Sequence, residues 1–426
     1  MLLKTPSLFD GHFQLGAVMM IRRRWLTGIP FRSGFAAKML ALLVVLAASM
    51  AAVESRSRRQ PDPRLQYDDM AKLASRDPLE KLSCELTSNK PALGFDLRFH
   101  SDYHATVPVR ALADAGEWFQ VAMRVTSRSE NGQPVYLANR FDIRKVPVGN
   151  KGDIELVDGF DLGPGTYRVD WIMRDARERV CSAHWDLEAK AGSGKQDLPL
   201  TLGPNQVVDA EMNDSSYRLQ PKEDAAQPLQ IKILLNLSPA KPQESIVRPE
   251  DAAALFAILR GIAGQPGIVV STVVAFNLRE EKIVYRQENA ERIDFLAMEK
   301  ATQSRTSGTI DISLLRDPQS ETHFVTGLLT DELGAQANSP DAIVIVGAKV
   351  SLERNVPRNS LKAMGSAICP VFYLNYTSNP LEPWPDTIGS ALKAYKGAAA
   401  YNIVFPRDLG LAMRELFSRV AKRSNS

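Results

Sequence analysis

The spacing of apolar residues changes once along the chain, and this change limits the fold more than any other feature. Between residues 84 and 190, apolar and polar residues alternate in short runs. From about residue 230 onward, the strand-like runs are apolar at consecutive positions, and stretches with helical spacing separate them. Alternation is typical of strands with one buried face, whereas continuous apolar runs are typical of strands buried on both faces. The sequence therefore predicts two domains of different fold class.

The first predicted domain, residues 84–190, is an antiparallel β-sandwich. Turn signals such as Asn131-Gly132 and Gly163-Pro164-Gly165 separate its alternating runs, which favours half-buried strands. Short strands at this density over roughly 100 residues are typical of immunoglobulin-like sandwiches. The stretch 165–169 also resembles the penultimate strands of such modules. The expected strands are residues 95–99, 118–126, 135–143, 154–160, 166–173 and 180–187.

The second predicted domain, residues 230–424, alternates strands with helices. Its most β-rich run is Ala342 to Val346, which contains no polar residue. Strands of this kind, separated by helices, predict an α/β doubly wound, mostly parallel sheet that is covered on both sides. The expected strands are residues 231–237, 267–277, 282–286, 342–346, 370–375 and 401–405, and the expected helices are 249–262, 291–301, 322–336, 387–396 and 408–422.

Residues 191–229, between the two domains, form a polar, Gly- and Pro-rich linker with one short strand expected at 207–210. The tetrad Gly192-Ser193-Gly194-Lys195 invites comparison with a phosphate-binding loop. That loop needs a glycine where this chain has Ala189, and a Ser or Thr where it has Gln196. We interpret the tetrad as flexible linker.

The N-terminal 53 residues have the pattern of an export signal. A run of apolar residues from Met39 to Val53 follows several arginines and Lys38, and Glu54 ends it. A spanning helix needs about 20 apolar residues, so this shorter, Ala-rich run favours a signal peptide over a short membrane anchor. A buried core helix is the remaining alternative. We expect export to the periplasm or secretion, with residues 54–83 as a spacer.

Composition argues against several functions. The net charge is +3, and the charges are interspersed rather than gathered into the basic stripe of a nucleic-acid binder. Three cysteines and five histidines, with no CxxC, disfavour zinc and redox chemistry. Cys84 and Cys181 are either unpaired or joined, and a disulfide between them would stabilise the first domain by about 3–4 kcal/mol.

One group of possible zinc ligands lies after the first expected strand. His100, Asp102 and His104 share one face if the segment is extended, and His184 is the further protein ligand that a closed site needs. The alternative is that these are exposed loop residues, and we favour it.

The region 230–424 resembles a von Willebrand factor type A domain of the kind found in exported bacterial proteins. The resemblance rests on layout and on fragments of the metal-binding motif. Members usually bind a divalent cation through an Asp-x-Ser-x-Ser loop after the first strand, a threonine from a later loop, and an aspartate after the fourth strand. The corresponding positions here are Asn236, Ser238, Ala240, Thr309 and Gly347.

The resemblance thus implies a degenerate site. Both carboxylates are replaced, and Ala240 offers no oxygen, so we predict no tight metal and no other cofactor. Asp311 and Glu244 are the nearby carboxylates with which a rebuilt site would compensate. The strand-end loops 238–247, 304–311, 347–360 and 376–387 form the expected partner face, because doubly wound folds bind ligands there.

Five positions are the predicted partner-binding residues: Asn236, Ser238, Thr309, Gly347 and Trp384. Trp384 stands between two prolines and either contacts a partner or packs over the sheet. No GxSxG or HExxH motif occurs. We predict a non-catalytic binding or scaffolding protein with a protein partner in the envelope or extracellular space, no nucleic acid, and membrane contact only through the N-terminal segment. The alternatives are metal-dependent adhesion through a rebuilt site and an exported enzyme with an unrecognised site.

Overall fold

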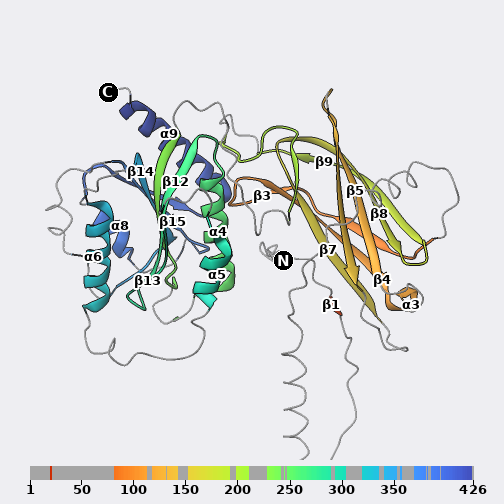
Figure 1. The fold of residues 1–426 in the computed structure, drawn as a ribbon, viewed down its shortest axis with the longest axis horizontal. Coiled ribbons are helices and arrows are strands. Elements are labelled where there is room, and N and C mark those ends of the chain that lie inside the picture. The colour runs from red at the N-terminus through yellow and green to blue at the C-terminus, as the bar shows by residue number, and fades with distance from the viewer. Residues whose placement is uncertain are drawn as a thin grey trace, which may run out of the picture.

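The structure is a computed structural model, and Figure 1 shows two lobes that lie side by side. It describes residues 20–21, 81–112, 118–130, 132–142, 152–191, 198–210, 228–240, 244, 247–288, 293–303, 319–334, 340–352, 356, 369–379, 381, 385–393 and 395–424. The expected export run and residues 54–80 of the expected spacer therefore lie outside the described residues. Residues 81–83, assigned to the spacer, instead belong to the sandwich, where Leu82 is buried in the core. Among the described residues, no helix combines the length and the apolar character needed to cross a membrane.

The first domain consists of two antiparallel sheets. In one, the strand order is β1-β7-β4-β2, and the short strands β3 and β10 pair with β4 and β7. In the other, the order is β6-β5-β8-β9. The elements are β1 (Met20–Ile21), β2 (Glu85–Ser88), β3 (Ala92–Leu93), β4 (Phe99–Pro108), α3 (Val109–Leu112), β5 (Trp118–Ser127), β6 (Pro134–Asp142), β7 (Asp153–Leu162), β8 (Gly165–Asp175), β9 (Val180–Ala189) and β10 (Val207–Asp209).

A shared apolar core joins the two sheets, as expected for a sandwich. Tyr103 of β4 and Trp171 of β8 are fully buried and meet edge to face, with ring centroids 5.7 Å apart. The Tyr167 hydroxyl donates to the Gly163 carbonyl oxygen at 2.7 Å, the backward bond that immunoglobulin-like folds use at a strand corner. Cys84 and Cys181 form a disulfide, which resolves the alternative that the sequence left open.

The second domain is built on one mixed sheet with the order β13-β12-β11-β14-β15-β16. Neighbouring strands are parallel except at the edge, where β13 runs antiparallel to β12. The elements are β11 (Leu229–Asn236), α4 (Pro249–Ala263), β12 (Ile268–Asn277), β13 (Lys282–Glu288), α5 (Phe295–Gln303), α6 (Ser320–Leu333), β14 (Ala342–Ala348), β15 (Val371–Tyr376), α8 (Thr387–Leu392), β16 (Ala398–Ile403) and α9 (Pro406–Ser424).

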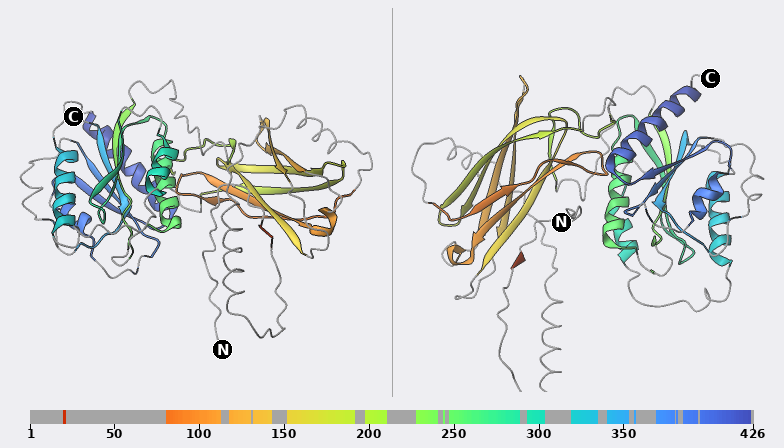
Figure 2. Two further views of the ribbon diagram at one scale, coloured as in Figure 1. Left: turned by 60° about the horizontal axis from the view of Figure 1, so that its bottom comes forward. Right: turned by 180° about the vertical axis from the view of Figure 1, so that it is seen from behind.

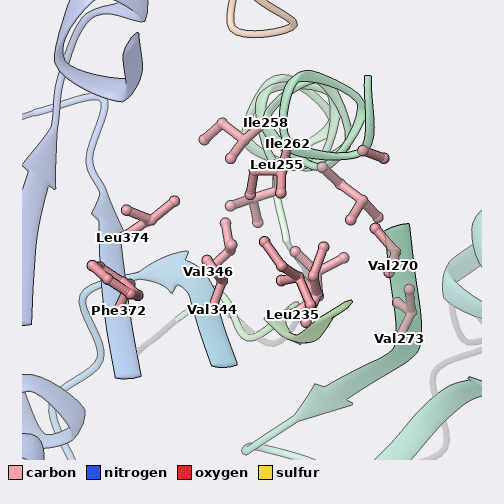
Figure 3. Close-up of a cluster of buried hydrophobic side chains, with 14 of the residues drawn as sticks. Leu235, Leu255, Ile258, Ile262, Val270, Val273, Val344, Val346, Phe372 and Leu374 are labelled. Carbon is pink, nitrogen blue, oxygen red and sulfur yellow. The ribbon is translucent and has the colours of Figure 1, made fainter. Parts of the chain in front are cut away.

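Helices cover both faces of this sheet. One apolar cluster joins the sheet to α4, α5 and α9, and another joins its opposite face to α6 and α8. Figure 3 shows α4 seen along its axis, with Leu255, Ile258 and Ile262 directed at the strands. Every residue of β14 and β15 is buried. The continuous apolar runs of β14 and β15 therefore correspond to strands buried on both sides, as predicted, whereas the edge strands β13 and β16 are partly exposed.

Two expected strands are placed differently in the structure. The run 95–99 alternates like a strand, yet β4 begins only at Phe99, and Leu97 has a positive φ of 60° in the turn that precedes it. The last strand ends at Ile403, so Phe405 lies in the bend between β16 and α9 rather than in the sheet. The short strand expected in the linker forms as β10 and pairs with β7 of the sandwich.

The turn before β4 joins the two domains. Leu97 is fully buried within the apolar cluster of the second domain, although it belongs to the first domain in sequence. A side chain at Gly261 of α4 would lie 2.6 Å from the Phe95 carbonyl oxygen, so the close approach of turn and helix requires glycine there. In both views of Figure 2 the lobes meet where α4 faces the sandwich.

Candidate functional site

The topology of the mixed sheet points to one end of two neighbouring strands. If its strands are numbered in chain order within the domain, their order in the sheet is 3-2-1-4-5-6. The connection from β11 to β12 and the connection from β14 to β15 therefore run toward opposite edges of the sheet. Doubly wound sheets bind ligands outside the carboxyl ends of the strands at such a switch point. Here that place is occupied by Asn236 at the end of β11 and Gly347 near the end of β14, which are register partners.

A compact set of hydrogen bonds closes this place, which we name the neutral corner: Asn236, Ser238, Leu278, Gly347 and Ala348. The Asn236 side-chain oxygen accepts from the Ser238 hydroxyl at 2.6 Å and from the Ser238 backbone N–H at 3.0 Å. The Ser238 hydroxyl oxygen accepts from the Leu278 backbone N–H at 2.7 Å, and the Asn236 amide donates to the Ala348 carbonyl oxygen at 3.4 Å. The polar atoms of this corner therefore bond to one another.

Gly347 makes the corner too tight for another side chain. A Cβ atom at this position would lie 2.4 Å from the Asn236 Cβ and 3.0 Å from its carbonyl oxygen. The aspartate that the type A resemblance implies near the end of this strand therefore has no room at residue 347. Glycine permits the close approach of β14 to β11.

The described part of this corner does not fit a divalent cation. Both lone pairs of the Asn236 side-chain oxygen already accept hydrogen bonds, and its amide directs hydrogens rather than lone pairs at Ala348. Ala240 is buried and has no ligand atom. A hard cation needs several oxygen ligands and a carboxylate to offset its charge, and these residues supply neither.

The predicted site residues fall into two groups. Asn236, Ser238 and Gly347 come together, but Asn236 and Ser238 are only 0% and 1% exposed. A side chain without exposed surface cannot contact a partner, so the role of these two residues is internal, in contrast to the partner contact predicted for them. Thr309, Trp384 and the alternative ligand Asp311 lie outside the described residues, and Glu244 is half-buried.

Two large apolar side chains are exposed at the same edge, and neither was singled out from the sequence. Leu381, in the loop after β15, is 87% exposed, and Phe405, just after β16, is 56% exposed. These are the two most exposed large apolar side chains among the described residues. Leu381 follows β15 and Phe405 follows β16. These two strands stay side by side up to their carboxyl ends, where the Thr377 N–H donates to the Ile403 carbonyl oxygen at 3.1 Å. We name Leu381 and Phe405 the apolar pair.

Side-chain hydrogen bonds hold the backbone of both loops. The Asn379 side-chain oxygen accepts from the Leu381 N–H at 3.1 Å, and the Thr377 hydroxyl donates to the Asn379 carbonyl oxygen at 2.8 Å. The Asp408 carboxylate accepts from the Phe405 N–H at 2.8 Å. Both apolar side chains therefore project from backbone that is already ordered.

A cation lies beside the Leu381 loop. Arg248, immediately before α4, donates to the Asp251 carboxylate at 2.8 Å and to the Ser378 hydroxyl at 2.9 Å.

Tyr376, the last residue of β15, contacts the first domain. Its ring meets Phe95 edge to face. Burial, more than the charge of the nearby Asp251, raises the pKa of Tyr376. The edge that carries the apolar pair is thus in direct contact with the first domain.

A carboxyl with a perturbed pKa also lies at this edge. Burial raises the pKa of Asp386, against the effect of a hydrogen bond from the Gly389 N–H and another from the Tyr373 hydroxyl. The Asp386 side chain caps the N-terminus of α8 through that bond to Gly389. Its partners therefore assign Asp386 a structural role.

A second polar cluster lies at the junction of the two domains, and we name it the charged junction: Asp96, Arg98, His100, Asp161 and Thr201. His100 Nε2 lies 2.8 Å from the Asp96 carboxylate, and His100 Nδ1 lies 2.6 Å from the Asp161 carboxylate. Arg98 lies 3.5 Å from Asp161 and donates to the Thr201 hydroxyl at 3.1 Å. A guanidinium group, an imidazole ring and two carboxylates thus share one largely buried space.

Asp96, His100 and Asp161 are close enough together to hold a metal ion. Their arrangement suits a proton better, because each ring nitrogen already faces a carboxylate and Arg98 supplies a further positive charge. Burial alone lowers the pKa of His100, but Asp96 and Asp161 outweigh it and raise that pKa to about 10. The ring is therefore an imidazolium at neutral pH.

The zinc cluster considered from the sequence does not assemble. His100, Asp102 and His104 do share a face of β4, so they are strand residues and not the loop residues that we favoured. His104 lies 3.4 Å from Asp102 and pairs with Glu155 at 2.8 Å, whereas His100 pairs with Asp96 and Asp161. His184 lies on β9, in the other sheet, where it pairs in register with Asp170.

Comparison with known proteins adds no function. The chain matches no protein-family model and none of the curated proteins. Among solved structures, a conjugate transposon protein from Bacteroides vulgatus aligns at 10% identity over 29% of this chain and 98% of its own, with a TM-score of 0.15. A glycosyl hydrolase family 2 member from Bacteroides cellulosilyticus aligns at 9% identity over 76% of this chain and 43% of its own, with a TM-score of 0.17. Scores this low carry no argument.

Proposed function

We propose that the chain is an exported, non-catalytic protein-binding or scaffolding protein. In this proposal the second domain is a type A-like domain without its metal site. A protein partner docks on the carboxyl edge of the sheet, over the apolar pair. The observation that carries the proposal is the exposure of Leu381 and Phe405, at 87% and 56%, on the edge where doubly wound folds bind ligands.

The ordered backbone around the pair supports a binding role. Large apolar side chains that project from fixed loops lose little entropy on association, and such anchors supply most of the energy of an interface. Arg248 lies near Leu381 but is already paired with Asp251 and Glu250, so the proposed partner presents mainly an apolar surface. Because the polar atoms of the neutral corner already bond to one another, the proposed partner binding involves no cation at that corner.

The type A-like assignment rests on the alternation of strands and helices in the sequence and on fragments of the metal-binding motif. The buried, polar-free run of β14 and the helices on both faces are compatible with that layout, in which no antiparallel edge strand such as β13 was foreseen. Export rests on the apolar run from Met39 to Val53 and is consistent with the Cys84–Cys181 disulfide, because such bonds persist in oxidising compartments.

A comparison of variants in a cross-linking pull-down tests the proposal. The full chain is expressed in its native host, and the envelope fraction is cross-linked and analysed for proteins captured with it. The partner is then purified and its dissociation constant measured. We expect L381S/F405S to weaken binding by about thirtyfold, the effect of losing a hot spot of about 2 kcal/mol.

Leu296 provides the matched control. It lies on α5 of the same domain and is 52% exposed, so L296S, compared with L381S alone, removes one exposed leucine side chain away from the apolar pair. Equal loss with L296S would contradict the assignment of the edge. Loss of binding in chelator would favour metal-dependent adhesion, and turnover of a captured molecule would favour an enzyme; either result overturns the proposal.

A further inference from the structure

The outer face of the sandwich contains a depression that the proposed partner face does not include. It has a volume of about 630 Å³, and strands β5, β6 and β8 form its floor. Its described lining is rich in cations and includes one exposed aromatic ring: Arg124, Thr126, Arg128, Pro134, Tyr136, Arg168 and Asp170.

The strand register explains why these side chains meet. Arg124 of β5 is paired with Tyr136 of β6 and with Asp170 of β8. Thr126, two residues further along β5, is paired with Pro134 and Arg168. Alternate residues of a strand share a face, so all of these point away from the sandwich core.

The charges in the depression do not balance. Arg124 donates to Asp170 at 2.7 Å, and Arg128 donates to Asp186 at 2.6 Å. Arg168 lies at the longer distances of 3.4 Å from Asp170 and 3.8 Å from Asp186, and its side chain is 41% exposed. Three guanidinium groups therefore share two carboxylates, and Arg168 is the surplus cation.

We propose that this depression binds a peptide segment that carries a single carboxylate beside an apolar side chain. The carboxylate takes the fork of Arg168, for which guanidinium has matched geometry, and the apolar side chain packs on Tyr136 and Pro134. A surplus of one positive charge matches one carboxylate. A phosphoryl group or a polyuronate chain brings more negative charge, which Asp170 and Asp186 would repel.

Binding of a defined probe to the full-length protein tests this site. The probe is a short, fluorescently labelled peptide, blocked at both ends, with a single glutamate flanked by leucines, and it is titrated by fluorescence anisotropy. We expect R168Q to weaken binding by about tenfold, the effect of losing one charge-assisted hydrogen bond. The same peptide with glutamine in place of glutamate should bind as weakly to the unmodified protein.

Two further variants separate recognition from misfolding. K190Q also removes one positive charge, at a residue just after β9 that is 68% exposed. We expect it to leave the affinity unchanged. D186N removes a carboxylate that competes for Arg128 and Arg168, so it should strengthen binding several-fold. A damaged fold cannot produce that gain.

Three results would overturn the proposal: no binding of the glutamate peptide, equal loss in R168Q and K190Q, or weaker binding in D186N. Inorganic phosphate, anionic phospholipid vesicles and polygalacturonate are tested as competitors. Stronger binding of any of these than of the peptide would also overturn it. None of these outcomes depends on the apolar pair, so the site stands or falls separately from the proposed function.

Discussion

The neutral corner and the charged junction are both buried and both contain residue types that bind metals, yet they satisfy their polar atoms in opposite ways. In the neutral corner, an amide and a hydroxyl exchange hydrogen bonds with backbone groups, and no formal charge is present. In the charged junction, an imidazolium lies between two carboxylates with an arginine beside it. The first cluster ends two strands, whereas the second lies where two domains meet.

The difference shows how each cluster avoids the cost of burial. Buried polar groups must be bonded, and buried charges must be paired, or they destabilise the fold by several kcal/mol. The neutral corner achieves this with uncharged groups and has no charge to place on a cation. The charged junction is balanced only while His100 holds its extra proton. We therefore expect the two clusters to respond differently to mutation and to pH.

The largest effect is expected from H100A at the charged junction. This change leaves Asp96 and Asp161 buried without the cation between them, which we expect to lower the free energy of unfolding by about 3 kcal/mol. Urea denaturation of the full chain gives the value. H104A is the control on the same strand, where the pair with Glu155 is more exposed, and it should cost less than about 1 kcal/mol. Equal costs would remove the distinction.

A smaller effect is expected from N236D at the neutral corner. The aspartate has no hydrogen to donate to the Ala348 carbonyl oxygen, and it places a negative charge in a site without a cation. We expect a loss of about 2 kcal/mol in the free energy of unfolding. Millimolar Mg²⁺ should not restore stability, because Ala240 and Gly347 still offer no side-chain ligand. Recovery above the stability of the unmodified protein in Mg²⁺ would show that the corner accepts a metal.

A pH titration is expected to give the most gradual effect. The pKa of His100 is raised from 6.5 to about 10, so the folded chain keeps a proton that the unfolded chain loses. This contribution to stability is complete below pH 6.5 and is lost as the pH rises through about 10. Between pH 7 and 9, the stability advantage over H100Q should fall by about 1 kcal/mol per pH unit. A constant advantage across this window would show that His100 is neutral.

Much of the fold was predictable because a strand buried on one face has alternating apolar residues, whereas a strand buried on both faces has a continuous apolar run. The alternation around Tyr167 and Trp171 and the continuous run of β14 each identified their strand type. Leu97 misled the prediction for a physical reason. Its alternating neighbours resemble a strand, but the side chain enters the core of the other domain, and a local pattern cannot say which core an apolar residue joins.

The candidate site was less predictable. Motif comparison located the strand ends and the missing carboxylates, but burial shows that Asn236 and Ser238 face inward. Phe405 could have been found, because Pro406 and Asp408 mark the start of a helix and so end the strand earlier. Leu381 offers no such signal, since its exposure depends on hydrogen bonds within its loop. The surplus charge at Arg168 depends on β5, β8 and β9 lying in register, which no single segment reveals.

The central claim is that the carboxyl edge of the second domain binds its partner through apolar surface and without a cation. Calorimetric titration of the full-length protein with Mg²⁺ and then Mn²⁺ tests it most directly, with S238A as the comparison. We predict no binding with micromolar affinity and identical traces for both proteins. Micromolar binding that S238A abolishes would contradict the account, because it would show that the neutral corner opens to hold a metal.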